Sequence, residues 1–149
     1  MFKKILIILL YLVSFLNISY SYAEVEVRKD YYPDGWLRSE IPHKDGKIDG
    51  VVKVYYENGQ LMTETPYKDG KIEGTLKWYY ENGQVKREVP YTDGKVEGIM
   101  KMYYKNGNLK WEIPYKGSKI EGTSKWYYEN GRLKQEISYK DRKLEGITK

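Results

Sequence analysis

From Glu24 to the end of the chain, apolar and polar residues alternate in short runs rich in Tyr, Val, Ile, Thr and Trp. Alternation with a period of two predicts strands with one buried face. The Asn-Gly and Asp-Gly dipeptides between the runs predict tight turns. Helical periodicity is absent over the same range. The pattern therefore predicts an all-β domain built from antiparallel hairpins.

This pattern returns every 24 residues without insertion or deletion. Paired tyrosines mark the starts of five units, at Tyr31, Tyr55, Tyr79, Tyr103 and Tyr127. Each unit contains two turn signals and hence one β-hairpin. Stacked hairpins predict an elongated single-sheet antiparallel meander over residues 24–149, with two strands per unit.

The first turn of each unit is predicted as a two-residue type I′ turn, because Asn-Gly tolerates positive φ at both positions. The turn residues are Asn58, Gly59, Asn82, Gly83, Asn106, Gly107, Asn130 and Gly131. Pairing around Asn58-Gly59 places Lys53 opposite Glu64, and a Lys–Glu pair recurs at this position in later units. Pro66 and its equivalents are expected where pairing ends or bulges before the second turn, because proline donates no ladder hydrogen bond.

Strand alternation sorts one hairpin into two faces. One face carries Ile72, Gly74, Leu76, Trp78, Tyr80, Val85, Arg87, Val89 and Tyr91. The opposite face is mainly Lys and Glu. Arg87 faces Trp78, where its guanidinium can stack on the indole.

A single layer leaves the apolar face uncovered, and exposed aromatic patches often mark recognition sites. The predicted binding surface comprises Leu76, Trp78, Tyr80, Val85, Tyr91, Trp126 and Tyr128. The alternative is that these side chains only pack within the sheet.

The first 23 residues differ from the repeats. Lys3 and Lys4 precede an apolar run from Ile5 to Leu16, and Ser21-Tyr22-Ala23 offers small residues where a signal peptidase cuts. We expect residues 1–23 to be a signal peptide and the protein to be periplasmic or extracellular; the alternative is that this segment is kept as a membrane anchor. The apolar run is shorter than the ~20 residues of a membrane-spanning helix.

Few residues offer reactive chemistry. The chain has one His, His43, and no Cys, so neither a metal site nor a nucleophilic triad is expected. The carboxylates that recur in every unit have Lys partners, which favours a structural role over a catalytic pair. We therefore expect no enzyme activity and no cofactor. The formal net charge is +5, but Lys and Glu alternate without a basic patch, which argues against nucleic acid as a partner.

Residues 67–74 (Tyr-Lys-Asp-Gly-Lys-Ile-Glu-Gly) resemble the core motif of the MORN repeat, and more closely its bacterial variant. The motif recurs at 91–98, and in imperfect form at 115–122 and 139–146; His43 replaces its aromatic residue in the first unit. The resemblance implies an elongated twisted sheet of hairpins and roles in protein–protein contact or membrane association. Many bacterial members are labelled antitoxin-like components of toxin–antitoxin systems.

Together these features predict an exported, non-catalytic scaffold that binds a protein or associates with the cell envelope. One alternative is an antitoxin or immunity-like protein that neutralises a toxin. A second is a surface protein that binds glycan or lipid. The expected partner is an unidentified protein, with self-association or contact to envelope lipid or glycan as further options.

Overall fold

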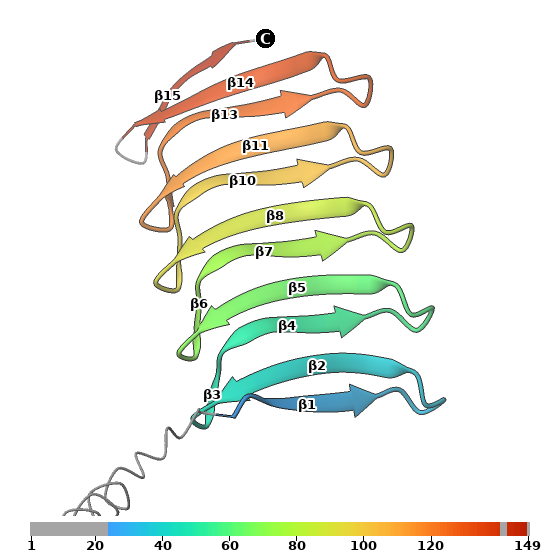
Figure 1. The fold of residues 1–149 in the computed structure, drawn as a ribbon. Coiled ribbons are helices and arrows are strands. Elements are labelled where there is room, and N and C mark those ends of the chain that lie inside the picture. The colour runs from blue at the N-terminus through green and yellow to red at the C-terminus, as the bar shows by residue number, and fades with distance from the viewer. Residues whose placement is uncertain (1–23, 141–142, 149) are drawn as a thin grey trace, which may run out of the picture.

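The computed structural model describes residues 24–140 and 143–148. The predicted signal peptide, residues 1–23, lies outside the described residues. The described part forms one open antiparallel sheet, in which strands that follow one another along the chain also lie side by side (Figure 1). No helix long and apolar enough to cross a membrane occurs in these two ranges.

Each unit contributes a six-residue strand, an eight-residue strand and, in four units, a two-residue strand at the second turn. The six-residue strands are β1 (Glu26–Tyr31), β4 (Gly50–Tyr55), β7 (Gly74–Tyr79), β10 (Gly98–Tyr103) and β13 (Gly122–Tyr127). The eight-residue strands are β2 (Leu37–Lys44), β5 (Leu61–Lys68), β8 (Val85–Thr92), β11 (Leu109–Lys116) and β14 (Leu133–Lys140). The two-residue strands are β3 (Lys47–Ile48), β6 (Lys71–Ile72), β9 (Lys95–Val96) and β12 (Lys119–Ile120). The sheet ends at β15 (Lys143–Thr148).

The main path of the sheet runs β1-β2-β4-β5-β7-β8-β10-β11-β13-β14-β15. Each two-residue strand pairs only with the eight-residue strand before it. The predicted all-β, single-sheet meander of hairpins is confirmed. The path has one strand more than two per unit, because β15 pairs with β14 after the fifth hairpin.

The predicted type I′ geometry of the first turn is wrong. The amide of Gly59 donates to the carbonyl of Tyr56 at 2.9 Å, and the amide of Tyr56 donates to the carbonyl of Gln60 at 2.8 Å, which makes a three-residue loop. Only Gly59 has positive φ. Asn58 stabilises this turn through its side chain, because its Oδ1 accepts a hydrogen bond from the Gln60 amide at 2.9 Å.

Type I′ geometry occurs instead at the second turn. Asp69 has φ 50° and Gly70 has φ 83°, and Lys68 pairs directly with Lys71 across this two-residue loop. The amide of Gly70 donates to the carbonyl of Ile48 at 2.8 Å. Equivalent bonds link the later second turns, so neighbouring units are joined at this edge as well as along their strands.

Pro66 lies at the predicted irregularity. Tyr67 pairs with Ile72, but Glu64 pairs with Lys77, so the later strand contains two extra residues between these pairs. The Glu73 amide donates to the Pro66 carbonyl across this bulge at 3.0 Å. Gly74 follows with φ +106°, and a Cβ there would lie 3.3 Å from Pro66 Cγ. Gly74 pairs with Tyr91 as expected, and its positive φ restricts this position to glycine, while the proline ring adds a tight contact.

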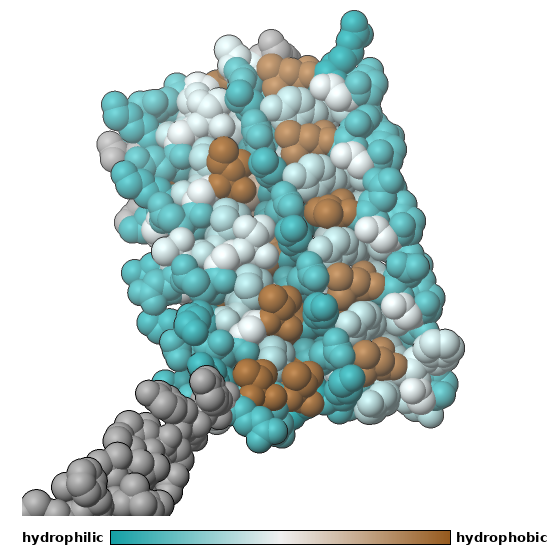
Figure 2. Space-filling view, in the orientation of Figure 1, coloured by the Kyte–Doolittle hydropathy of each residue, from teal (hydrophilic) through white to brown (hydrophobic). Residues whose placement is uncertain are grey.

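A row of alternating lysine and glutamate crosses the sheet from β1 to β14. We call it the Lys–Glu ladder, and the face that carries it the charged face. Its members in order are Lys29, Glu40, Lys53, Glu64, Lys77, Glu88, Lys101, Glu112, Lys125 and Glu136. Pairing within hairpins confirms the prediction, and pairing between hairpins extends it. Figure 2 shows this face, with a hydrophilic column flanked by hydrophobic residues.

Tyrosines brace the ladder between units. The Tyr79 hydroxyl donates to Glu64 at 2.7 Å, and the Tyr55 hydroxyl donates to Glu40 at 2.9 Å. Burial and the hydrogen bond to Glu40 raise the pKa of Tyr55 to about 12. Burial and a hydrogen bond to Glu88 likewise raise the pKa of Tyr103 to about 12. Burial and the acceptor carboxylates thus hold these phenols in their neutral form.

The best-buried side chains form a row on the opposite face. Leu76 pairs with Val89, and they are 7% and 2% exposed. Met100 and Ser124 occupy the same position in the next two units, and Ser124 is 0% exposed. The core of this one-layer sheet is therefore a narrow strip that continues from unit to unit.

Shortening a side chain in this strip should destabilise the protein. Leu76→Ala removes buried contacts and should lower the free energy of unfolding by roughly 2–5 kcal/mol. Val51→Ala, at a position 43% exposed on the charged face, should change it by less than about 1 kcal/mol. Urea unfolding followed by tryptophan fluorescence measures both; equal losses would contradict a core on this side.

The braced tyrosines predict alkaline unfolding. An unfolded tyrosine ionises near pH ~10, whereas Tyr55 and Tyr103 keep their protons to about 12 in the folded protein. The unfolded state binds fewer protons in this window, so their contribution is complete below pH ~10 and is lost as pH rises towards ~12. Melting temperature measured against pH should fall there. Tyr55→Phe with Tyr103→Phe should flatten the fall, and an unchanged slope would refute the assignment.

Candidate binding surface

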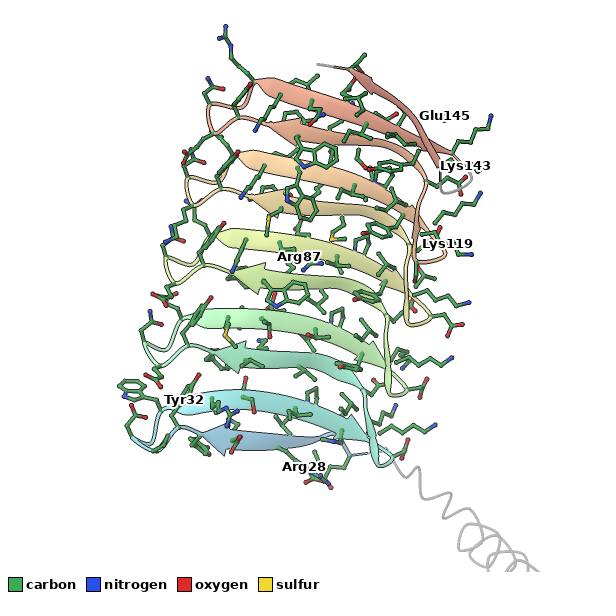
Figure 3. All side chains as sticks on the ribbon, turned by 180° about the vertical axis from the view of Figure 1, so that it is seen from behind. Arg28, Tyr32, Arg87, Lys119, Lys143 and Glu145 are labelled. Atoms are coloured by element: carbon green, nitrogen blue, oxygen red, sulfur yellow. The ribbon has the colours of Figure 1, made fainter. Side chains whose placement is uncertain are left out.

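One row of side chains lies beside the buried strip, on the face opposite the Lys–Glu ladder. We call it the Trp row, and the face that carries it the Trp face. Register pairs its members consecutively from β2 to β14: Ser39, Val54, Thr63, Trp78, Arg87, Met102, Trp111, Trp126 and Gln135. Ser39 is buried, and the others are half-buried. Figure 3 views this side of the sheet, with Arg87 near its middle.

The Trp row differs in chemistry from unit to unit, whereas the Lys–Glu ladder does not. The position of Arg87 is Ser39, Thr63, Trp111 or Gln135 in the other units. The position of Trp78 is Val54, Met102 or Trp126 in later and earlier units. Since the same backbone accommodates all of these side chains, the fold does not dictate which one stands there. The chemistry of the row can therefore vary along the sheet, whereas that of the repeated positions does not.

Arg87 is held by its neighbours on this face. Its Cζ lies 5.0 Å from the centre of the Trp78 ring, a distance typical of cation–π contact. Its Nη2 lies 3.1 Å from the sulfur of Met100. Its Nε is buried and has no hydrogen-bond partner among the described residues. Stacking and burial thus fix the guanidinium while leaving part of its donor capacity unused.

The second tyrosine of each pair lies at the edge of the sheet formed by the first turns. The Tyr80 hydroxyl donates to the carbonyl of Tyr103, the first tyrosine of the next pair, at 2.8 Å. Tyr32, Tyr56 and Tyr104 make the same bond to the following unit. Lys86 Nζ lies 5.6 Å from the centre of the Tyr80 ring. An open depression of about 600 Å³ lies here, lined in part by Tyr56, Tyr80 and Lys105.

The residues predicted from the sequence as one binding surface fall in different places. Trp78 and Trp126 belong to the Trp row, whereas Leu76 is buried beside it. Tyr80 lies at the turn edge, as does Tyr128, which is 49% exposed. Tyr91 pairs with Gly74 on one side and with Val96 on the other, close to the second turn of its unit.

The prediction that Val85 shares the face of Trp78 is wrong. Val85 pairs with Tyr79 after a bulge. It lines one shallow depression together with Glu88 and Tyr103, whose side chains belong to the charged face. The bulge adds one residue to the strand, which reverses the alternation for Val85.

The binding surface predicted from the sequence did not include Trp111 and Met102, which both belong to the Trp row. Trp111 pairs with Met102 on one side and Trp126 on the other, so it joins two hairpins. The alignment of neighbouring hairpins depends on the two-residue bulge beside each proline, and the 24-residue period alone does not reveal the size of that bulge. Continuing the Lys–Glu alternation from one hairpin to the next would have predicted the offset between them.

The described residues hold no cluster of three or more His, Asp or Glu side chains suited to a metal ion. His43 Nδ1 lies 3.0 Å from the carbonyl oxygen of Ile41, on its own strand. The raised tyrosine pKa values belong to the repeated braces of the Lys–Glu ladder. What distinguishes the Trp row is a set of three indoles along one strip, one of which contacts the Arg87 guanidinium.

Comparison with known families supports this geometry. The family described as MORN repeat variant matches the chain in five stretches, at residues 27–45, 48–69, 72–93, 96–116 and 120–141. Comparison with curated proteins gives no match. The five stretches together span more than half of the chain and follow its hairpins one by one. The chain therefore belongs to the MORN repeat variant family.

Proposed function

We propose that this protein is a non-catalytic scaffold that binds another protein along its Trp row. The observation that carries this proposal is the row itself: half-buried aromatic side chains that differ from unit to unit, on a face that no second layer of the described chain covers. Uniform repeats provide the frame. The varied row provides a surface that a specific partner can distinguish.

The composition of the Trp row suits protein binding. Trp, Met and Arg are enriched at the centres of protein interfaces, and Trp and Arg dominate the residues that carry most of the binding energy. Trp78, Arg87, Met102, Trp111 and Trp126 are consecutive members of the row. A partner that covers them would remove their remaining apolar surface from water, which favours association.

The charged face is less suited to this role. Its lysines and glutamates lie directly opposite one another across neighbouring strands, and the glutamates also accept bonds from tyrosines. A partner would have to compete with these internal contacts. The same pattern in every unit would also give it no preferred register along the sheet.

Neutralisation of a toxin would be one form of such binding, with the toxin as the partner. Glycan or lipid binding would instead draw on the tyrosines at the turn edge. The Trp row favours a protein, because it combines three indoles, a thioether and a guanidinium along one half-buried strip. Photocrosslinking separates a protein partner from glycan or lipid by the chemical nature of the captured molecule, and the identity of a captured protein shows whether it is a toxin.

Photocrosslinking in the cells that produce the protein tests the surface. Benzoylphenylalanine in place of Met102 should crosslink to one protein partner, because Met102 lies mid-row. The same group in place of Ile99, which is 49% exposed, should not capture that partner. Trp78→Val with Trp126→Val should reduce the crosslink at least ~10-fold by loss of interfacial aromatic contact.

Matched variants keep this test independent of folding. Val54 stands at the register of Trp78, so the two Val variants suit the sheet. Val51→Thr with Ile99→Thr alters the charged face at a register that Thr75 and Thr123 already occupy, and should leave the Met102 crosslink unchanged. Crosslinking from position 99 alone, capture of only glycan or lipid, or no effect of the Val variants would reject the proposed surface.

We further propose that the repeat domain acts outside the cytoplasm, after removal of residues 1–23. The charged start, apolar run and Ser21-Tyr22-Ala23 sequence support this. Intact mass of the exported protein should give an N-terminus at Glu24. Ala23→Leu places a large residue at the cut site and should leave the longer form. An exported protein that retains Met1, or one found only in the cytoplasm, would contradict the proposal.

A further inference from the structure

We propose that Arg87 anchors an acidic side chain of the bound partner, so that the Trp row recognises an extended segment in which a carboxylate is flanked by apolar residues. This inference rests on the proposed function and names the chemistry of the ligand. Its basis is the position and surroundings of one guanidinium that makes no ion pair among the described residues.

Arg87 is the cation in the middle of the Trp row. Its cross-strand neighbours within the row are Trp78 and Met102. None of the ion pairs among the described residues includes Arg87. The near acceptor of its Nη2 is the thioether of Met100, a weak acceptor, and its Nε has none. Because Nε is buried, a ligand cannot reach that atom. The side chain as a whole is only half-buried and has no carboxylate partner among the described residues, so a ligand can pair with the accessible side of the guanidinium.

The surroundings of Arg87 favour binding an anion. Contact with the Trp78 ring fixes the plane of the guanidinium, so little side-chain freedom remains to be lost on binding. Partial burial lowers the local dielectric, which strengthens a charge-assisted hydrogen bond. The planar donor fork of arginine matches the two oxygens of a carboxylate.

A carboxylate fits this site better than a phosphate does. A phosphate group carries nearly two negative charges and is usually bound by several cations. The row holds one cation at its centre, and the lysines of the ladder lie on the opposite face, paired with glutamates. The flanking indoles and thioether instead suit apolar side chains on either side of a singly charged group.

The row also sets the length of the segment. From Trp78 to Trp126 it crosses β7, β8, β10, β11 and β13. At ~4.8 Å between strands this span is about 19 Å, which about six extended residues cover. A twelve-residue peptide therefore spans this part of the row with residues to spare.

The test uses two pools of capped twelve-residue peptides. Both have random Leu, Ile, Thr and Ser positions around one central residue, which is Glu in the first pool and Gln in the second. The folded wild-type protein should retain the Glu pool about tenfold more tightly, because a charged acceptor strengthens the bond to the guanidinium. Fluorescence anisotropy of the labelled pools gives the ratio.

Variants assign that preference to Arg87. Arg87→Gln should abolish it, and Gln135 at the same register shows that the sheet accepts this side chain. Arg87→Lys should keep part of the preference, whereas Trp126→Val should weaken binding of both pools alike. Circular dichroism melting confirms that each variant is folded.

Two outcomes would overturn the proposal. One is the absence of a Glu preference in the wild-type protein, including binding of neither pool. The other is a preference that persists in a folded Arg87→Gln variant. Crosslinking at Met102 judges the proposed function separately, because it requires only that a protein lies on the row, whatever the charge of that protein.

Discussion

The alternation of lysine and glutamate across the sheet determines which residue of each strand lies opposite which residue of the next. A slip by one residue would place lysines opposite residues of the Trp face instead of glutamates, and would turn the apolar side chains of that face towards the ladder. Tyrosine hydroxyls reinforce the correct register, since Tyr79 reaches Glu64 in the preceding hairpin. The buried strip and the Trp row are continuous only in this register, because each takes one residue from every strand that it crosses.

Rows of side chains in this sheet differ in how closely they repeat from unit to unit. Positions repeated in every unit form the ladder, the turns and the contacts between units, and they have to be nearly the same everywhere. The Trp row is exempt from that requirement, because Val54, Trp78 and Met102 all fit one position of the hairpin. A chain of near-identical units can thus present a surface that is different along its length.

Much of this arrangement could be predicted from the sequence, because the period fixes the hairpins and the Lys–Glu pairs fix the register within each one. The errors arose at irregular backbone. The Asn58-Gly59 turn was assigned from conformational tolerance, whereas the asparagine acts through a side-chain hydrogen bond. Val85 was assigned to the wrong face because a bulge beside the turn adds a residue. Trp111 was missed because the offset between hairpins arises at the proline bulge, which strand alternation does not encode.

Each unit is tied to the next by one tyrosine hydroxyl, by the bond between second turns and by strand pairing, and these contacts recur with the same spacing along the chain. Insertion or loss of a whole unit would therefore preserve every junction while changing the length of the Trp row by two side chains. The length of the sheet is therefore set by the number of hairpin units. Duplication of a unit lengthens the sheet, and substitution at two positions then determines the chemistry of the added part of the Trp row.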